Sequence, residues 1–119
     1  MTPEFIGEYF KVGPIPLKTA LTKIYPVSPT CKGVWIECVR INNTTGAGHQ
    51  VSVCLVDAGG AAGQTNAWLW EKNLGAKDSE DVAKEVWIGA GTEIWAKTAD
   101  GDDNCNIFIC GLVGKGYRR

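Results

Sequence analysis

Apolar and polar residues alternate along much of this chain with a period of two, the spacing of side chains on the two faces of a β-strand. Val51, Val53 and Leu55 fall on one such face, and smaller side chains stand between them. Clusters of Gly, Asn and Asp, which favour turns, separate the runs. The pattern predicts seven strands, over residues 17–25, 33–42, 50–56, 67–74, 85–88, 92–98 and 106–113.

Short strands divided by turn residues are typical of an antiparallel β-sandwich, here either immunoglobulin-like or jelly-roll-like. Residues 42–48 are rich in Asn, Thr and Gly, and they predict a hairpin between the second and third strands. One segment disagrees, because Ser79 could cap a helix in which Val82 and Val86 are one turn apart. One or two helical turns over residues 79–86 are therefore an alternative to strand.

The two ends of the chain differ in composition from its middle. The first residues carry apolar side chains among several Pro and Gly, which favour an extended backbone. We expect an arm that packs on a neighbouring molecule, or else an extra edge strand of the same sandwich. The expected divisions are an extended N-terminal arm over residues 1–16, a sandwich over residues 17–114 and a basic tail over residues 115–119. The arm residues that we predict to bind a partner are Phe5, Ile6, Tyr9 and Phe10.

Composition and charge argue against a nucleic-acid or membrane partner. The chain has 119 residues, the length of one domain, and 45% of them are hydrophobic. Its 12 basic and 13 acidic residues give a net charge of −1, without the clustered Lys and Arg that phosphate binding requires. No run of about 20 apolar residues predicts a membrane span, and the first residues do not resemble an export signal. We expect no nucleic-acid or membrane partner, and a protein that stays in the cytoplasm or leaves it inside a larger particle.

Five cysteines, without a Cys-x-x-Cys pair, favour free thiols over a disulfide framework. Those at positions 38, 54 and 110 stand in apolar runs, where we expect small buried side chains. His49 is the only histidine, and it lies in a Gly-rich turn away from any Cys or Ser. We therefore expect no enzyme activity, no catalytic residue and no cofactor.

A turn near residue 100 contains Asp100, Asp102 and Asp103, whose oxygens suit Ca²⁺. The distal Glu of an EF-hand loop is missing, so a solvated turn is the alternative and no metal ligand is assigned. Metal binding at this turn stays an open question at the level of sequence.

Five tryptophans are many for a chain of this length. They could fill a core or a subunit interface, or form a flat platform for sugar rings. Trp68 and Trp70 share one face of the strand predicted over residues 67–74, and Leu69 lies on the other face. A strand with large apolar groups on both faces indicates a subunit contact, so we predict that both tryptophans bind a partner.

Several segments follow one another in a recognisable order, with a strand and Asn-Asn-Thr-Thr-Gly turn, a strand–Gly turn–strand unit and a closing strand. These segments are residues 23–26, 39–46, 51–56, 86–97 and 108–111. Their order resembles the small β-sandwich proteins of tailed-bacteriophage virions, and the resemblance covers roughly residues 19–112. The Trp content and the stretch over residues 75–84 depart from the pattern. The resemblance implies a head-decoration (cement), head-completion or tail-associated component of the virion.

Together these observations predict a virion structural protein, assembled in the host cytoplasm, that decorates the capsid and stabilises the head. The expected partners are the major capsid protein or other virion subunits, and further copies of the chain, with a trimer favoured by the resemblance. Two alternatives stay open. The first is a tail or head–tail joining component, and the second is a carbohydrate-binding adhesin that uses exposed Trp.

Overall fold

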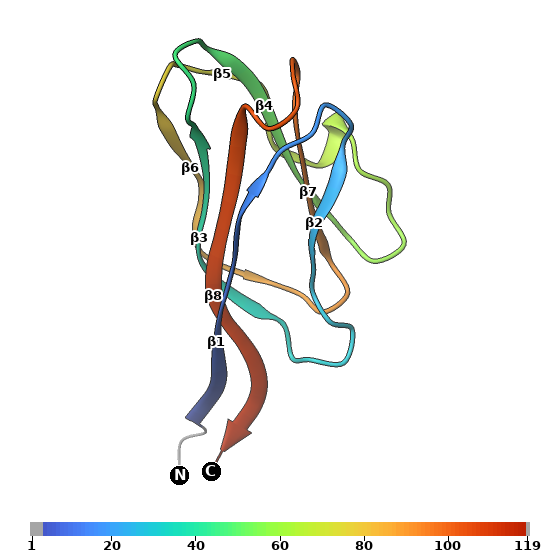
Figure 1. The fold of residues 1–119 in the computed structure, drawn as a ribbon. Coiled ribbons are helices and arrows are strands. Elements are labelled where there is room, and N and C mark those ends of the chain that lie inside the picture. Colours follow the sequence, from blue (N-terminus) through green and yellow to red (C-terminus); the bar gives the residue numbers. More distant parts are fainter. Residues whose placement is uncertain (1–3, 119) are drawn as a thin grey trace.

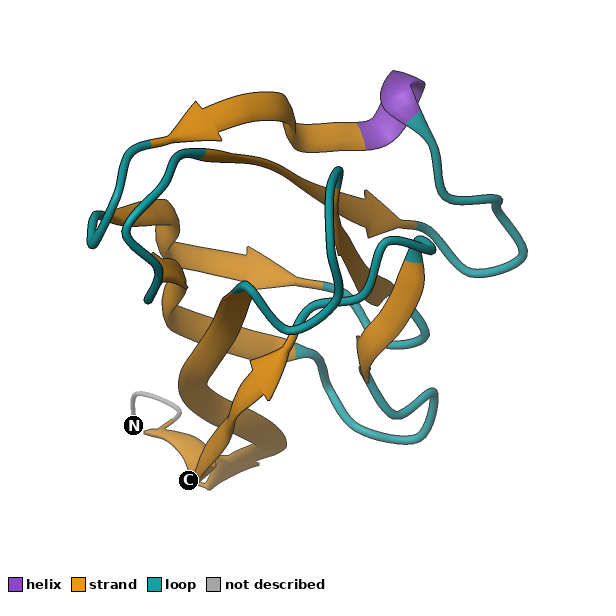
Figure 2. Ribbon diagram, turned by 45° about the horizontal axis from the view of Figure 1, so that its top comes forward, coloured by secondary structure: helices purple, strands orange, loops and turns teal. Residues whose placement is uncertain are grey.

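The computed structural model describes residues 4–118, with the side chains of residues 7–115. Eight antiparallel strands form two sheets of four, packed face to face as a β-sandwich (Figures 1 and 2). A three-residue 3₁₀ turn, η1 (Gln64–Asn66), precedes the fifth strand. The strands are β1 (Glu4–Pro16), β2 (Thr22–Pro26), β3 (Val34–Asn43), β4 (His49–Val56), β5 (Ala67–Leu74), β6 (Ser79–Ile88), β7 (Glu93–Thr98) and β8 (Cys105–Arg118).

The strand order is that of a jelly roll. Sheet A has the order β1-β8-β3-β6, and sheet B has the order β2-β7-β4-β5. The pairs are nested, since β1 pairs with β8, β2 with β7, β3 with β6 and β4 with β5. In an immunoglobulin-like sandwich the first two strands are neighbours in one sheet, whereas β1 and β2 lie in different sheets here. The sandwich predicted from the sequence is confirmed, and its order is the jelly-roll one.

The interior is aliphatic. Sheet A contributes Val34, Ile36 and Ile41 from β3, and sheet B contributes Val53 and Ile94. All five are fully buried, and each contributes on the order of 1.5–3 kcal/mol of hydrophobic stabilisation. Every tryptophan, in contrast, is at least partly exposed.

The predicted helical alternative over residues 79–86 is wrong. These residues lie in β6, where Val86 pairs with Ile36 and Ala83 pairs with Val39. Isolated helices of one or two turns are unstable in water, because nucleation is costly. Pairing with β3 and packing of Val82 against the core outweigh that weak local preference.

The predicted hairpin over residues 42–48 is also wrong, because β3 and β4 belong to different sheets. The connection crosses the sandwich, and the buried Asn43 organises it. The Asn43 Nδ2 donates to the carbonyl oxygens of Ala47 at 2.7 Å and Leu74 at 3.0 Å, and its Oδ1 accepts from the Thr45 amide at 3.0 Å. The backbone N–H of Asn43 donates to the carbonyl oxygen of Asp78. The side chain and the backbone of Asn43 together hold the β3–β4 crossover against the β5–β6 crossover.

The segment expected as an arm is an edge strand of this sandwich. Strand β1 pairs with β8 from Glu4, opposite Arg118, to Pro16, opposite Asn106. Pairing satisfies the backbone donors and acceptors of one side of the segment, and Val12 packs against the core. Residues 115–118 of the expected basic tail continue β8, and residue 119 lies outside the described part.

The paired ends of β1 and β8 run beyond the sandwich as a narrow two-stranded ribbon (Figure 1). The Cα atoms extend over 54 × 28 × 17 Å, with the long dimension along these strands. Within residues 4–118, no helix is long and apolar enough to cross a bilayer.

A β-bulge in the middle of sheet A sets the direction of the side chains of β3. Ile36 pairs with Gly111 and Cys38 pairs with Cys110, so Glu37 is an extra residue on β3. An extra residue changes the phase of alternation. Ile36 and Val39 therefore both face the core, although three positions separate them, and Glu37 and Cys38 between them face outward.

We expect Gly111→Ala to destabilise the fold strongly, because the bulge brings the two backbones into contact at this position. A Cβ on Gly111 would collide with the carbonyl oxygen of Trp35 and lie 3.1 Å from Ile36 Cα. Overpacking against backbone costs about 2 kcal/mol or more. Urea unfolding measures the change. Gly46→Ala is the control, since a Cβ there meets no heavy atom within 4 Å and should change stability by less than about 0.5 kcal/mol. Equal stability of the two variants would contradict the bulge.

Candidate binding surface

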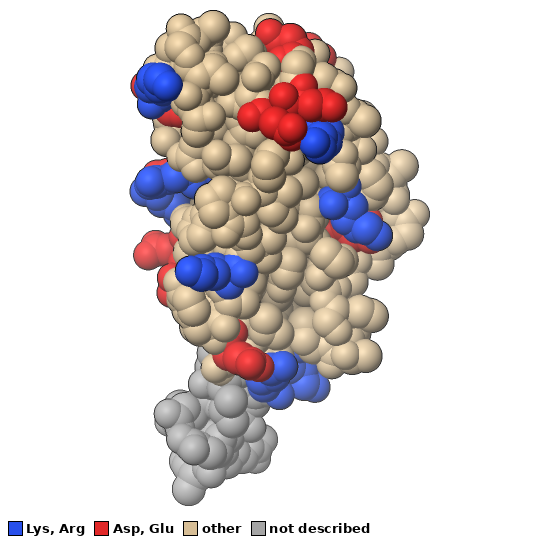
Figure 3. Space-filling model, viewed as in Figure 1, with Lys and Arg blue, Asp and Glu red and all other residues tan. Residues whose placement is uncertain are grey.

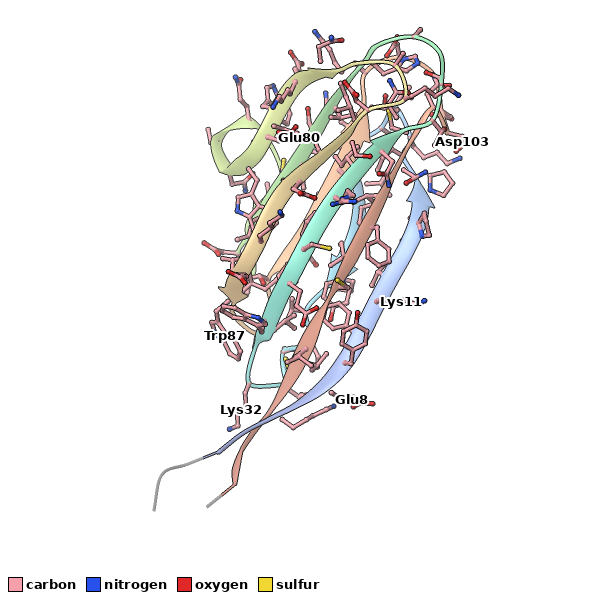
Figure 4. All side chains as sticks on the ribbon, turned by 90° about the vertical axis from the view of Figure 1, so that its left-hand side faces the viewer. Glu8, Lys11, Lys32, Glu80, Trp87 and Asp103 are labelled. Carbon is pink, nitrogen blue, oxygen red and sulfur yellow. The ribbon has the colours of Figure 1, made fainter. Side chains whose placement is uncertain are left out.

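The outer face of sheet A carries a row of large apolar side chains that crosses all four strands. Tyr9 on β1 is opposite Leu112 on β8, Leu112 is opposite Trp35 on β3, and Trp35 is opposite Trp87 on β6. None of the four packs against the core cluster. We call these four residues the aromatic row, and Figure 4 looks on to the sheet that carries it.

The two ends of the aromatic row are open to solvent. Tyr9 is 60% exposed and Trp87 is 44% exposed, and within the described side chains they are the large hydrophobic residues that stand out as exposed. Trp35 and Leu112 between them are half-buried. The Trp87 ring lies against the backbone of Gly33, where a Cβ would come within 2.5 Å of it. The Trp87 side chain is therefore held at one edge of the sheet.

The next row contains two cysteines. Lys11 is opposite Cys110, Cys110 is opposite Cys38, and Cys38 is opposite Lys84. The Cys38 and Cys110 Sγ atoms are 3.3 Å apart. Burial, and then the hydrogen bond with Cys110, raise the pKa of the Cys38 thiol to about 11. The Cys110 charge and its hydrogen bond raise the pKa of the neighbouring Tyr9.

The opposite end of the same face is polar. Arg40 Nε donates to Asp81 Oδ1 at 2.8 Å, and this bond is the first cause of the lowered pKa of Asp81. Beyond them an amide ladder runs across three strands, in which Asn42 Nδ2 donates to Asn106 Oδ1 at 2.9 Å. Ser79 Oγ donates to Asn42 Oδ1 at 2.7 Å. The face thus changes from polar to apolar towards the end where the β1–β8 ribbon leaves the body.

The outer face of sheet B is covered by the chain itself at β4. Ser52 and Cys54 on β4 alternate with core residues and are nevertheless buried. Cys54 Sγ donates to the carbonyl oxygen of Gly63, at 3.3 Å, in the loop that precedes η1. Sheet A therefore offers the more open of the two outer faces. In the view of Figure 3, basic and acidic side chains lie near one another around a broad uncharged area.

The structure separates the residues that the sequence predicts to bind a partner. Tyr9 lies in the aromatic row, whereas Phe10 faces inward and stacks on Tyr25 with the ring centroids 5.0 Å apart. Phe5 and Ile6 lie in β1, and their side chains are outside the described part. We leave Phe10 out of the candidate surface.

Trp68 and Trp70 do not form one surface. Trp68 packs against the core, while the Trp70 ring lies 4.8 Å from Lys97 Nζ on the outer side of sheet B. Two register shifts in the pairing of β4 with β5 interrupt the regular alternation in this region. Trp35 and Trp87, which the sequence pattern does not single out, are the tryptophans of the candidate surface.

The polar groups considered for catalysis or metal binding are each engaged with different partners. His49 Nδ1 lies 3.0 Å from Asp100 Oδ1. Asp102 accepts the Thr19 amide at 2.8 Å, and Asp103 accepts Lys18 Nζ at 2.7 Å. Within the described residues, no three His, Cys, Asp or Glu side chains come together as a metal site would require.

A shallow pocket of about 180 Å³ lies beside the start of the β1–β8 ribbon. Its volume is below the roughly 300–1,000 Å³ of typical small-molecule sites. The lining residues are Ser28, Thr30, Cys31, Lys32, Val113, Gly114 and Lys115.

No protein-family model, curated protein or solved structure matches the chain. Its function must therefore be inferred from the surface of the sandwich itself. The aromatic row is the feature of that surface most suited to binding a macromolecule, because exposed apolar groups that adjoin one another mark interaction sites.

We expect the alkylation of Cys38 by iodoacetamide to accelerate about tenfold per pH unit from pH 7 to about 10. The thiolate is the nucleophile, and a pKa of about 11 keeps it a minor species over that range. For an ordinary thiol with a pKa of about 8.5 the alkylation rate levels off near pH 9.5, and the unfolded protein provides that control. Mass spectrometry of the peptide 33–40 follows the rate, and a plateau below pH 9 in the folded protein would contradict the raised pKa.

The titratable or charged groups around Cys38 are Tyr9 and Lys11 on β1, Glu37 and Arg40 on β3, Asp81 and Lys84 on β6, and Cys110 on β8.

Proposed function

We propose that the chain is a bacteriophage virion structural protein that decorates the capsid and stabilises the head. The aromatic row across the outer face of sheet A carries this proposal. An extended sheet face with Tyr and Trp at its apolar end suits a flat protein partner better than a small ligand. The resemblance to virion sandwich proteins supports the choice of a capsid subunit as that partner.

The mechanism would be added buried area between the sandwich and the shell. Tyr and Trp are the side chains that most often dominate binding energy, because they bury much apolar area with few rotatable bonds. Tyr9 and Trp87 stand at opposite edges of sheet A, so a decoration protein lying on this face could touch two neighbouring capsid subunits. Bridging two subunits raises the free energy needed to open the shell without covalent chemistry.

Self-association is part of the proposal. We propose a homo-oligomer, and the resemblance favours a trimer. The two edge strands of sheet A, β1 and β6, have one side without a strand partner in the described chain, and such edges commonly pair or pack in assemblies.

One observation supports the alternative function, a carbohydrate-binding adhesin. Trp35 and Trp87 are directly opposite on adjacent strands, and both are at least partly exposed. Two adjacent aromatic rings of this kind can stack against sugar rings. Retention on a glycan array that is lost in Trp87→Ala, without any binding to capsids, would favour the adhesin.

Rebinding to particles stripped of the protein tests the proposal. We expect the double variant Tyr9→Ser/Trp87→Ser to bind at least about 100-fold more weakly, since two interface anchors of this kind contribute on the order of 1.5–2 kcal/mol each. Point variants are preferable to deletion of residues 1–16, because that deletion removes strand β1.

Trp70→Ser is the matched control, because Trp70 is a partly exposed tryptophan on the other sheet. It should bind as the wild type does and should restore the disruption temperature of the particles. Equal affinity of the double variant and the wild type would refute the role of the aromatic row. A wild-type protein that neither rebinds nor raises the disruption temperature would refute the decoration function itself.

A further inference from the structure

Cys38 and Cys110 meet on the outer face of sheet A although 72 positions separate them in the chain. Their Cα atoms are direct partners on the adjacent antiparallel strands β3 and β8. The two sulfur atoms are 3.3 Å apart, closer than two side chains need to be for packing alone. The pair is therefore a dithiol whose two members already face each other.

The bulge at Glu37 is what brings Cys38 to this face. With regular alternation from Ile36, position 38 would face the core, as Ile36 does. The extra residue turns Cys38 outward, where it is half-buried, while Cys110 is 7% exposed. Bulges often re-aim a side chain at a functional position.

The other three cysteines lack such an arrangement. Cys31 Sγ donates to the carbonyl oxygen of Ser28 at 3.1 Å, and Cys54 Sγ donates to a carbonyl oxygen in the loop before η1. Cys105 is part of the core cluster. A reagent that approaches the outer face of sheet A reaches the more exposed Cys38 first, and Cys110 lies beside it on β8.

We propose that Cys38 and Cys110 form a redox-active dithiol that a low-molecular-weight disulfide oxidises to a cross-strand disulfide. This inference goes beyond the proposed function and does not depend on it, because it concerns the chemistry of the isolated chain.

The reaction is a double thiol–disulfide exchange. The Cys38 thiol gives up its proton, and its thiolate attacks one sulfur of the small disulfide, forming a mixed disulfide and releasing one small thiolate. Cys110 then loses its proton and attacks Cys38 Sγ, which breaks the mixed disulfide and releases the second small thiolate. The two released thiolates take up the two protons. Two electrons pass from the protein dithiol to the small disulfide, which becomes two thiols.

The geometry admits the product without a change of fold. Directly opposite residues of an antiparallel pair have Cα atoms about 4.5–5.5 Å apart. Disulfides span Cα distances of roughly 4.4–6.8 Å, so rotation of the two side chains can shorten the sulfur separation to a covalent bond.

The disulfide would join the two central strands of sheet A. The loop that it closes contains β4, β5, β6 and β7. A crosslink around so long a loop restricts the unfolded chain strongly, and we expect the Tm to rise on the order of 10 °C. Reduction would reverse the change.

The test equilibrates the reduced full-length protein with excess oxidised glutathione at about pH 9 for many hours, because the raised pKa of Cys38 keeps the attacking thiolate scarce at lower pH, and then blocks free thiols with N-ethylmaleimide. We expect a mass lower by two hydrogen atoms before blocking, and a tryptic product that links peptide 33–40 to peptide 98–115. Because peptide 98–115 contains both Cys105 and Cys110, the experiment is repeated in Cys105→Ala to assign the bond.

Two variants complete the design. Cys31→Ser removes another half-buried thiol and should leave the crosslink and the rise in Tm unchanged. The Cys38→Ser variant should fold, because side chain 38 faces outward, and it should show neither the crosslink nor the rise in Tm. The proposal is overturned if both thiols remain free to react with N-ethylmaleimide after oxidation. It is equally overturned if Cys38 keeps a glutathione adduct that Cys110 never displaces, or if the crosslink joins a different pair.

Discussion

A single extra residue in β3 decides which side chains of sheet A face the core and which face outward. Before Glu37, Val34 and Ile36 point inward and Trp35 points outward. After it, the phase changes, so that Val39 joins them in the core while Cys38 turns outward. The small Gly111 on β8 allows the two backbones to approach at this point. The core residues of β3 after the bulge and the paired thiols depend on this irregularity, because they require the phase that it sets.

The nested pairing of the jelly roll gives this face its second property. Strand β8 lies between β1 and β3, so the first and the eighth strands are neighbours in sheet A. Side chains from four distant segments therefore share one surface, with an amide ladder at one end and exposed aromatic rings at the other. The Cys38–Cys110 dithiol lies between these two ends, on β3 and β8. The crosslink that we propose would fix the positions of β3 and β8 relative to each other within the face that we propose to bind.

The period-two pattern and the turn residues suffice to predict the sandwich, and the segment over residues 67–74 coincides with β5. Local patterns could not predict which strands pair. The Asn-Thr-Gly segment after β3 has the composition of a hairpin turn, yet the buried Asn43 amide binds a second crossover that lies some 30 positions further along the chain. Residues 79–86 have a local preference for helix, and pairing with β3 overrides it. The candidate binding surface could not be predicted for the same reason, since Trp35 and Trp87 become neighbours only through the register of β3 and β6. The sequence offers Tyr9 only as an apolar residue of the segment expected as an arm, and its place in the aromatic row follows from its pairing with Leu112.

We propose that the chain meets its partner through the outer face of sheet A. Oxidative footprinting of aromatic side chains, read by mass spectrometry on the free protein and on the protein bound to assembled particles, distinguishes this face from the rest of the surface. We expect Tyr9 and Trp87 to be modified readily in the free protein and protected on the particle, while modification of Trp70 does not change. Equal modification of Tyr9 and Trp87 in the two states, with protection elsewhere, would contradict it.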